Sequence, residues 1–178
     1  MDIKYAILGL LSWRELSGYD LKKMMQDSEL FYWSGNNNQI YSTLVHLHHE
    51  GLVDVQLQPQ EHLPIRKLYS LTIEGKDALK HWLISEPQLP QLRKTFLIQL
   101  AWSIDLSHQE IDNLLATYEN EVRLRLVMLK EQLKRGTLIN PARNPREKYV
   151  WSMIWDNYMQ SYQAELEWAS KLRRNLPE

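Results

Sequence analysis

The feature that most constrains the fold is a change of hydrophobic period around Gly51. Before it, Ile40, Leu44 and Leu47 recur at spacings of four and three residues, which is typical of one face of an amphipathic helix. After it, residues 53–58 (VDVQLQ) alternate strictly between apolar and polar side chains, which is typical of a half-buried strand. Because glycine is a common helix stop, this pattern predicts a helix that passes directly into a strand.

The neighbouring segments complete a short series of elements. IKYAILGLLSW is apolar enough for a buried helix, and SGYDLKKMMQD predicts a second helix that Ser17 or Gly18 can open. After PQEHLP, whose two prolines we expect to interrupt the strand at a hairpin tip, residues 65–71 resume in extended form. Thr72 can then cap a further helix. Three helices, a hairpin and a helix follow in the order of a winged helix-turn-helix.

In a winged helix the third helix, here about residues 36–50, turns a polar face outward toward the major groove of DNA. Four residues lie opposite the apolar stripe: Gln39, Ser42, Thr43 and His46. We expect Tyr41 and Leu52 to extend the buried side instead.

The start of this helix is unusually rich in amides, in the stretch SGNNNQ. Asn and Gln can pair bidentately with adenine, and a helix N-terminus suits a phosphate, but a single Asn could also serve simply as a cap. We expect Gln39 and Ser42 to contact base edges more directly than Asn36 or Asn37.

A proline-rich segment, SEPQLPQL, marks the predicted boundary between two domains, residues 1–85 and 86–178. Beyond it we expect only helices. LRKTFLIQLAWSI predicts a short helix, and the capping box SHQE opens a long helix that ends near Gly136. Asn144, Pro145 and Glu147 supply an N-cap, a proline at the first position and an acid at the third for a last helix. The short helix should carry one loose apolar side, formed by Leu92, Phe96, Leu100 and Ile104.

The two long helices each carry one apolar stripe. The first stripe comprises Ile111, Leu115, Tyr118, Val122, Leu126, Leu129 and Leu133. The second comprises Trp151, Trp155, Tyr158, Tyr162, Leu166 and Ala169. Because little else is available to cover these stripes, a second copy of the chain is the economical partner. Trp151, Trp155, Tyr158 and Tyr162 fit either a bundle core or dimer interface, or an aromatic effector pocket.

Composition excludes several classes of function. There are no cysteines, so disulfides, thiol catalysis and thiolate metal sites are ruled out, and a reducing cytoplasm fits. The longest apolar run is too short to span a bilayer and lacks the features of a signal peptide, so we expect no membrane association. No nucleophile elbow, phosphate-binding glycine loop or zinc signature occurs, so we expect neither an enzyme nor a bound cofactor.

The histidines and the charge balance leave two questions open. His46, His49 and Glu50 share helical spacing, which allows half a metal site, although a polar helix face is the simpler interpretation. Protonation of His46 could also add positive charge at a DNA surface. The first 85 residues hold eight Lys and Arg against ten Asp and Glu, a net charge of −2. Nucleic-acid binding must therefore rest on local clusters.

Five features in the first half of the chain resemble the PadR family of bacterial transcriptional regulators. They are Gly-Tyr at the start of the second helix, Ile-Tyr-x-x-Leu in the third, Gly-Leu-Val before the wing, Arg-Lys-x-Tyr on its second strand and Leu-Thr-x-x-Gly after it. The second half is similar, in length and helical character, to the subgroup with a long C-terminal dimerisation domain that includes the virulence activator AphA.

The resemblance implies a mainly α protein with a minor α+β character: an N-terminal winged helix-turn-helix and an all-helical dimerisation domain. It also implies a homodimer that binds double-stranded operator DNA and that could respond to a small aromatic effector. The residues carried over as DNA contacts are Tyr19, Lys22, Asn38, Gln39, Tyr41, Ser42, His46, Arg66, Lys67 and Tyr69. The alternative, which the near-neutral first half favours, is a helical protein–protein interaction module without DNA binding.

Overall fold

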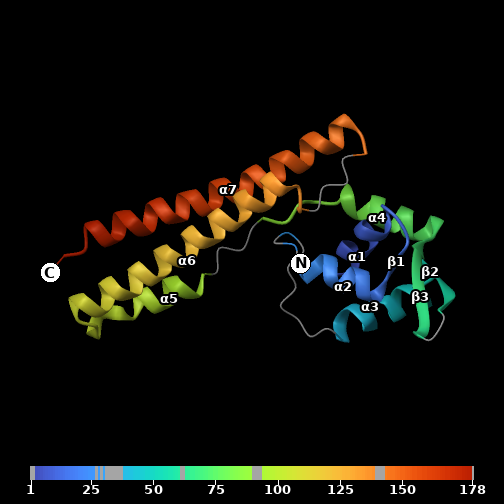
Figure 1. Ribbon diagram of the computed structural model, residues 1–178, viewed down its shortest axis with the longest axis horizontal. Helices are drawn as coiled ribbons and strands as arrows, with labels where there is room; N and C mark the ends of the chain where they lie inside the picture. The colour runs from blue at the N-terminus through green and yellow to red at the C-terminus, as the bar shows by residue number, and fades with distance from the viewer. Residues whose placement is uncertain are drawn as a thin grey trace. The chain divides into compact units, whose positions relative to one another are not determined.

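The computed structural model describes residues 3–26, 28, 30, 38–60, 63–89, 94–138 and 143–177. The chain divides into two compact units, Met1–Gln88 and Leu89–Glu178. The first unit contains α1 (Ile3–Leu11), β1 (Leu16–Ser17), α2 (Gly18–Gln26), α3 (Asn38–His49), β2 (Val53–Gln60), β3 (Leu63–Leu71) and α4 (Ile73–Leu83). The second contains α5 (Thr95–Ala101), a single 3-10 turn η1 (Ser103–Asp105), α6 (His108–Arg135) and α7 (Pro145–Arg174). This architecture confirms the predicted fold class (Figure 1).

The first unit closes around one apolar core. Ile7 and Leu8 of α1, Leu21 of α2, Leu44 of α3 and Val53 of β2 are fully buried there. The predicted stripe of α3 is therefore its buried face. Burying such side chains stabilises a fold by roughly 1.5–3 kcal/mol each, so this core dominates the stability of the unit.

The hairpin of β2 and β3, residues 53–71, is called the wing below. It belongs to a three-stranded antiparallel sheet in the order β1-β3-β2. The expectation that the prolines interrupt the strands is wrong, because β2 continues to Gln60 and β3 begins at Leu63. The register shifts between Gln58 and Gln60, so Pro59 lies at an irregularity of an edge strand, where a missing N–H is tolerated. Residues 61–62 at the tip lie outside the described residues.

The motif Leu-Thr-x-x-Gly joins the wing to α4. The Thr72 hydroxyl accepts a hydrogen bond from the Gly75 N–H and donates one to the Gly51 carbonyl. A Cβ added to Gly75 would lie 2.1 Å from the Leu52 carbonyl oxygen, which is closer than any side chain permits. The glycine therefore lets α4 lie directly against the chain that enters the wing.

The second unit is built on two long helices that lie side by side (Figure 1). The capping box of Ser107 and Glu110 opens α6, and Gly136, with φ +64°, ends it. Asn144 caps α7 as expected. Leu115, Val122, Leu126 and Leu129 of the first stripe are buried, as are Trp151, Trp155 and Ala169 of the second.

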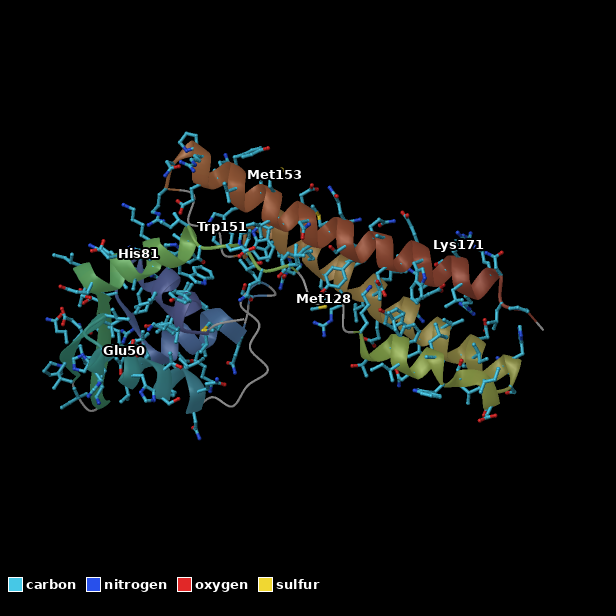
Figure 2. The ribbon with its side chains drawn as sticks, turned by 180° about the vertical axis from the view of Figure 1, so that it is seen from behind. Glu50, His81, Met128, Trp151, Met153 and Lys171 are labelled. Carbon is cyan, nitrogen blue, oxygen red and sulfur yellow. The ribbon has the colours of Figure 1, made fainter. Side chains whose placement is uncertain are left out.

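The labelled residues in Figure 2 show how these helices divide their surfaces. Trp151 points between α7 and α6, whereas Met153 and Met128 lie on the sides turned away from the partner helix. Both methionines are about half exposed. Within the described residues, no helix combines the length and the apolar character needed to cross a bilayer.

The short helix α5 differs from its prediction. Phe96 is buried, but Ile104 belongs to the separate turn η1 and is 87% exposed, so the four expected residues do not share one side. Leu92 lies outside the described residues. The Phe96 ring stacks on Tyr118 of α6, with 3.6 Å between ring centroids. One aromatic contact, rather than an apolar stripe, therefore attaches α5 to α6.

A polar cluster reinforces this attachment. The Tyr118 hydroxyl donates a hydrogen bond of 2.6 Å to Glu165 of α7, and the Lys94 ammonium pairs with the same carboxylate. Burial is the largest effect on Glu165 and raises its pKa, but the bonds from Lys94 and Tyr118 and the Lys94 charge together lower it. Burial and the bond to Glu165 raise the pKa of Tyr118.

Candidate nucleic-acid interface

The inner side of α3 packs into the core, and the side that remains on the surface is mostly polar. Ile40, Leu44 and Leu47 are buried, which turns the opposite side of the helix to the surface. The exposed polar residues on it are Asn38, Gln39, Ser42, His46 and His49. Of the four residues predicted to lie opposite the apolar stripe, Gln39, Ser42 and His46 are exposed and Thr43 is half-buried. The predicted Asn36 and Asn37 lie outside the described residues.

Ser42 has a defined local hydrogen bond. Its hydroxyl donates to the carbonyl oxygen of Gln39, one turn earlier, with 3.0 Å between the oxygens. With its proton engaged in this way, the hydroxyl presents lone pairs to the surroundings. Ser42 is therefore arranged as a hydrogen-bond acceptor on the outer side of α3.

Val45 was not among the predicted contacts, although it is 64% exposed on the same side of α3. It lies three residues after Ser42 and four before His49, so these three side chains are neighbours on the helix surface. The signal was present in the sequence: Val45 falls out of phase with the apolar stripe of α3. Asn38, Gln39, Ser42, Val45, His46 and His49 are together called the outward face below.

Tyr41 lies at the edge of this surface and corrects one expectation. It is 45% exposed and does not simply extend the buried side. Its ring packs over the start of α2, where a Cβ added to Gly18 would come within 2.5 Å of the Tyr41 Cε1 atom. The pairing of Gly18 in α2 with Tyr41 in α3 therefore fixes how the two helices of the helix-turn-helix meet. Tyr19 and Lys22 of α2 are exposed and half-buried, respectively.

Arg66 on the wing is held by a carboxylate. Its Nη2 atom lies 2.6 Å from an Asp20 carboxylate oxygen, which also accepts hydrogen bonds from the backbone N–H and the hydroxyl of Ser17. Burial is the largest effect on Asp20 and raises its pKa, but the bonds from Ser17 and Arg66 together lower it. The charge of Arg66 is therefore compensated, and the residue ties β3 to the N-terminus of α2.

The other two predicted wing residues differ from each other. Lys67 is exposed and, as the next residue on the strand, points to the opposite face of the wing from Arg66. Tyr69 is 7% exposed and belongs to the core together with Val53 and Leu16. In the sheet, Tyr69 of β3 pairs with Leu16 of β1. A direct DNA contact by Tyr69 does not fit this position. Burial is the main cause that raises the pKa of Tyr69, and the charge interaction with the neighbouring Tyr41 raises it further.

The histidines at the end of α3 do not form a metal site with Glu50. The Glu50 carboxylate pairs with Lys4 of α1 at 2.6 Å, and this bond is the main cause of its lowered pKa. His48 Nδ1 lies 3.0 Å from the Val53 carbonyl oxygen. Across the described ranges of the chain, no cluster of three metal-ligating side chains occurs.

In the second unit, three of the four predicted aromatic residues, Trp151, Trp155 and Tyr158, form a ladder along α7. The centroids of Trp151 and Trp155 lie 6.1 Å apart, and those of Trp155 and Tyr158 lie 5.9 Å apart. Both tryptophans are buried, and the Trp155 Nε1 atom has no hydrogen-bond partner. Tyr158 and Tyr162 stay half-buried.

A shallow groove of about 340 Å³ between α6 and α7 is lined by other residues. Its lining includes the apolar side chains of Leu126 and Met159 and the charged side chains of Lys130 and Glu167. None of the four predicted aromatic residues of α7 lines this groove.

Comparison with known proteins connects these features to one family. Residues 7–81 match the model of the transcriptional regulator PadR-like family. The negative transcriptional regulator PadR of Bacillus subtilis is 33% identical over 130 residues, which are 72% of this chain and 70% of that protein.

Solved structures agree over nearly the whole length. B. subtilis PadR in complex with operator DNA superposes with a TM-score of 0.84, with 26% identity and 98% of both chains covered. The same protein in complex with p-coumaric acid gives a TM-score of 0.79, with 25% identity and 97% of this chain and 96% of that chain covered. The Vibrio cholerae virulence activator AphA has the same fold, with a TM-score of 0.70, 24% identity and 98% of both chains covered.

Proposed function

This chain belongs to the PadR-like family of transcriptional regulators, and on that premise we propose that it is a homodimeric regulator that binds double-stranded operator DNA with the outward face of α3 in the major groove. The observation that carries this proposal is the division of α3. Its apolar stripe is completely buried, while Gln39, Ser42 and His46 are exposed on the other side. A related protein of the same fold has been solved with operator DNA.

The contacts around α3 have separate roles in this proposal. Asn38, Gln39, Ser42 and His46 face base edges, and Tyr19 and Lys22 of α2 with Tyr41 lie near the phosphates. Lys67 supplies a phosphate contact from the wing because it is exposed and no acid compensates its charge in the described contacts. Arg66 acts through Asp20, since their ion pair holds the wing against α2.

Dimerisation is supported by the apolar surface of the second unit. Trp102 and Ile104, beyond α5, are 80% and 87% exposed, and Leu124, Val127 and Met128 expose a further apolar strip on α6. Apolar side chains that are exposed along helices in this way suit a surface that a partner covers, and a second copy of the chain is the economical partner. Two copies would present two α3 helices, and the operator should then be a pseudo-palindrome with half-sites about one helical turn or a multiple apart.

A small aromatic effector is part of the proposal because B. subtilis PadR has been solved with p-coumaric acid. Tyr158 and Tyr162 of α7 are half-buried, so their rings offer stacking surface to such an effector. An effector that binds only one arrangement of the helical dimer would shift the spacing of the two DNA-binding units and thereby change affinity. We place this activity in the cytoplasm, as the absence of cysteine favours.

The test is binding to the promoter upstream of the gene that encodes this chain, measured by footprinting and fluorescence anisotropy with the full-length protein. We expect a protected pseudo-palindrome, and a loss of at least tenfold in affinity for the variant Gln39→Ala with Ser42→Ala. The matched control is Ile73→Ala on α4, an exposed residue outside the interface. If the wild-type protein protects no sequence but captures another protein through the same surface, the interaction-module alternative replaces this proposal.

A further inference from the structure

Val45 is an apolar residue on an otherwise polar stretch of α3. Positions 38, 42, 45 and 49 are spaced by four, three and four residues and so form one stripe of the outward face. Asn38, Ser42 and His49 are polar, and Val45 is 64% exposed among them. Its side chain is therefore available to a partner that approaches the outward face.

The exposed valine does little for the stability of the first unit. Most of its surface stays in contact with water, and a β-branched residue in a helix is a few tenths of a kcal/mol less favourable than a straight-chain residue such as Lys or Glu. The core below α3 is already completed by Leu44 and Leu47, which are fully buried. A role in contact with a partner accounts for Val45 better than a role in folding.

The chemistry of the major groove offers one apolar group for such a side chain. Thymine presents its C5-methyl group there, whereas the other groups of the base edges are hydrogen-bond donors and acceptors. Ser42 adds a second condition, because its hydroxyl proton is donated to the Gln39 carbonyl oxygen and its lone pairs face outward. The donors that such an acceptor can meet in the major groove are the adenine N6 and cytosine N4 amino groups.

We propose that Val45 is a specificity-determining residue that contacts the C5-methyl group of a thymine, while Ser42 accepts a hydrogen bond from the adenine of the same or the adjacent base pair. The Cβ atoms of residues three apart on a helix lie about 5–6 Å from each other, which suits contacts to one base pair or to two adjacent pairs. This inference rests on the proposed function, since it identifies what one part of the outward face reads.

The experiment begins with in vitro selection of binding sites from a random-sequence DNA duplex library. Full-length wild-type protein, Val45→Ala, Ser42→Ala and the control Ile73→Ala are selected in parallel. We expect the wild type and Ile73→Ala to enrich the same half-site. Val45→Ala should lose the preference for thymine at one position, and Ser42→Ala should lose a preference at that pair or the next.

The second step removes only the methyl group from the DNA. Deoxyuridine replaces each thymine of the selected site in turn, and affinity is measured by fluorescence anisotropy. At the position that depends on Val45, the substitution should weaken wild-type binding about fourfold per half-site, the effect of one buried methyl group. The same substitution should leave the affinity of Val45→Ala unchanged.

Each outcome bears on the inference separately from the proposed function. If the wild type tolerates deoxyuridine at every thymine, or if Val45→Ala selects the wild-type site, Val45 does not read thymine although the protein still binds operator DNA. If Ile73→Ala loses the same preference as Val45→Ala, the effect is not specific to the outward face and the inference fails. If the wild type enriches no sequence, the proposed function itself is wrong.

Discussion

The first unit has a closed apolar core beside exposed apolar side chains such as Val45 and Ile73, whereas the second buries fewer apolar side chains fully and exposes more of them along its helices. Eight of the eleven largest fully buried side chains among the described residues belong to the first unit, and three to the second. In the first unit, helices and a sheet surround a common centre, so each element covers another. In the second, α6 and α7 mainly cover each other, so each buries one stripe and keeps an exposed flank. The elements of the first unit therefore close a core of their own, whereas each long helix of the second unit keeps exposed apolar side chains.

The largest effect is expected from a cavity in the core of the first unit. Leu44→Ala removes a fully buried side chain from α3 and should cost about 2–5 kcal/mol of unfolding free energy. The adjacent Val45→Ala, which truncates an exposed side chain, should change the unfolding free energy by less than about 0.5 kcal/mol. Urea unfolding followed by circular dichroism compares the two. Equal losses for both variants would show that the core of the first unit is not closed beneath α3.

The next test asks whether a second copy of the chain covers the exposed apolar side chains of the second unit, as proposed. Trp102→Glu together with Ile104→Lys places charges on side chains that are already exposed in one chain, so the helices themselves should keep their structure. If these residues are covered by a second copy, sedimentation should show monomers. Operator affinity should then fall about 100-fold, because the second half-site is no longer bound within the same complex. A dimer that survives this pair of charges would place the interface elsewhere.

A smaller effect is expected inside the second unit, where a polar cluster attaches α5. Tyr118→Phe removes the hydrogen bond to Glu165 and should cost about 1 kcal/mol of unfolding free energy. Thermal unfolding at neutral pH measures this loss. The control Tyr149→Phe removes a hydroxyl from an exposed ring of α7 and should have little effect.

The pH dependence of the unfolding free energy gives a second measurement on the same cluster. The pKa of Glu165 is lowered below its usual value of 4.5, so its ionised form stabilises the folded state above about pH 4.5. This stabilisation is lost as the pH falls through the lowered folded-state pKa. Glu165→Gln should therefore reduce the free energy of unfolding at pH 7 and flatten its fall below pH 4.5. An unchanged acid profile in Glu165→Gln would remove the carboxylate from this role.

The smallest effect is expected for the operator affinity of variants at Lys67 and Arg66, the two basic residues of the wing. Lys67→Gln should weaken operator binding a few-fold and reduce the slope of log affinity against log salt by about one, because one phosphate contact is lost. Arg66→Gln should reduce affinity with a smaller change in slope, since its charge is compensated by Asp20. Fluorescence anisotropy across a salt series measures both slopes. The opposite order would show that Arg66 leaves Asp20 to bind a phosphate.

Much of the first unit and of its interface was predictable from local patterns. The buried stripe of α3 follows from the spacing of Ile40, Leu44 and Leu47. Gln39, Ser42 and His46 are exposed because their positions fall on the opposite side of the helix. Two kinds of detail escaped. The exposure of Val45 was not predicted because an apolar residue is readily assigned to a core. The continuation of β2 through Pro59 was not predicted either, because an edge strand tolerates a residue without an N–H.

The sequence by itself determined where α6 and α7 begin, where α6 ends, which stripe of each of them is apolar and which face of α3 is polar. These properties depend on residues within one or two turns of each other, so periodicity and capping are sufficient to predict them. Only the tertiary structure decided that Arg66 is held by Asp20, 46 positions away, and that Tyr69 lies in the core. Such contacts depend on which strand pairs with which and on what packs above it, and no local spacing carries that information.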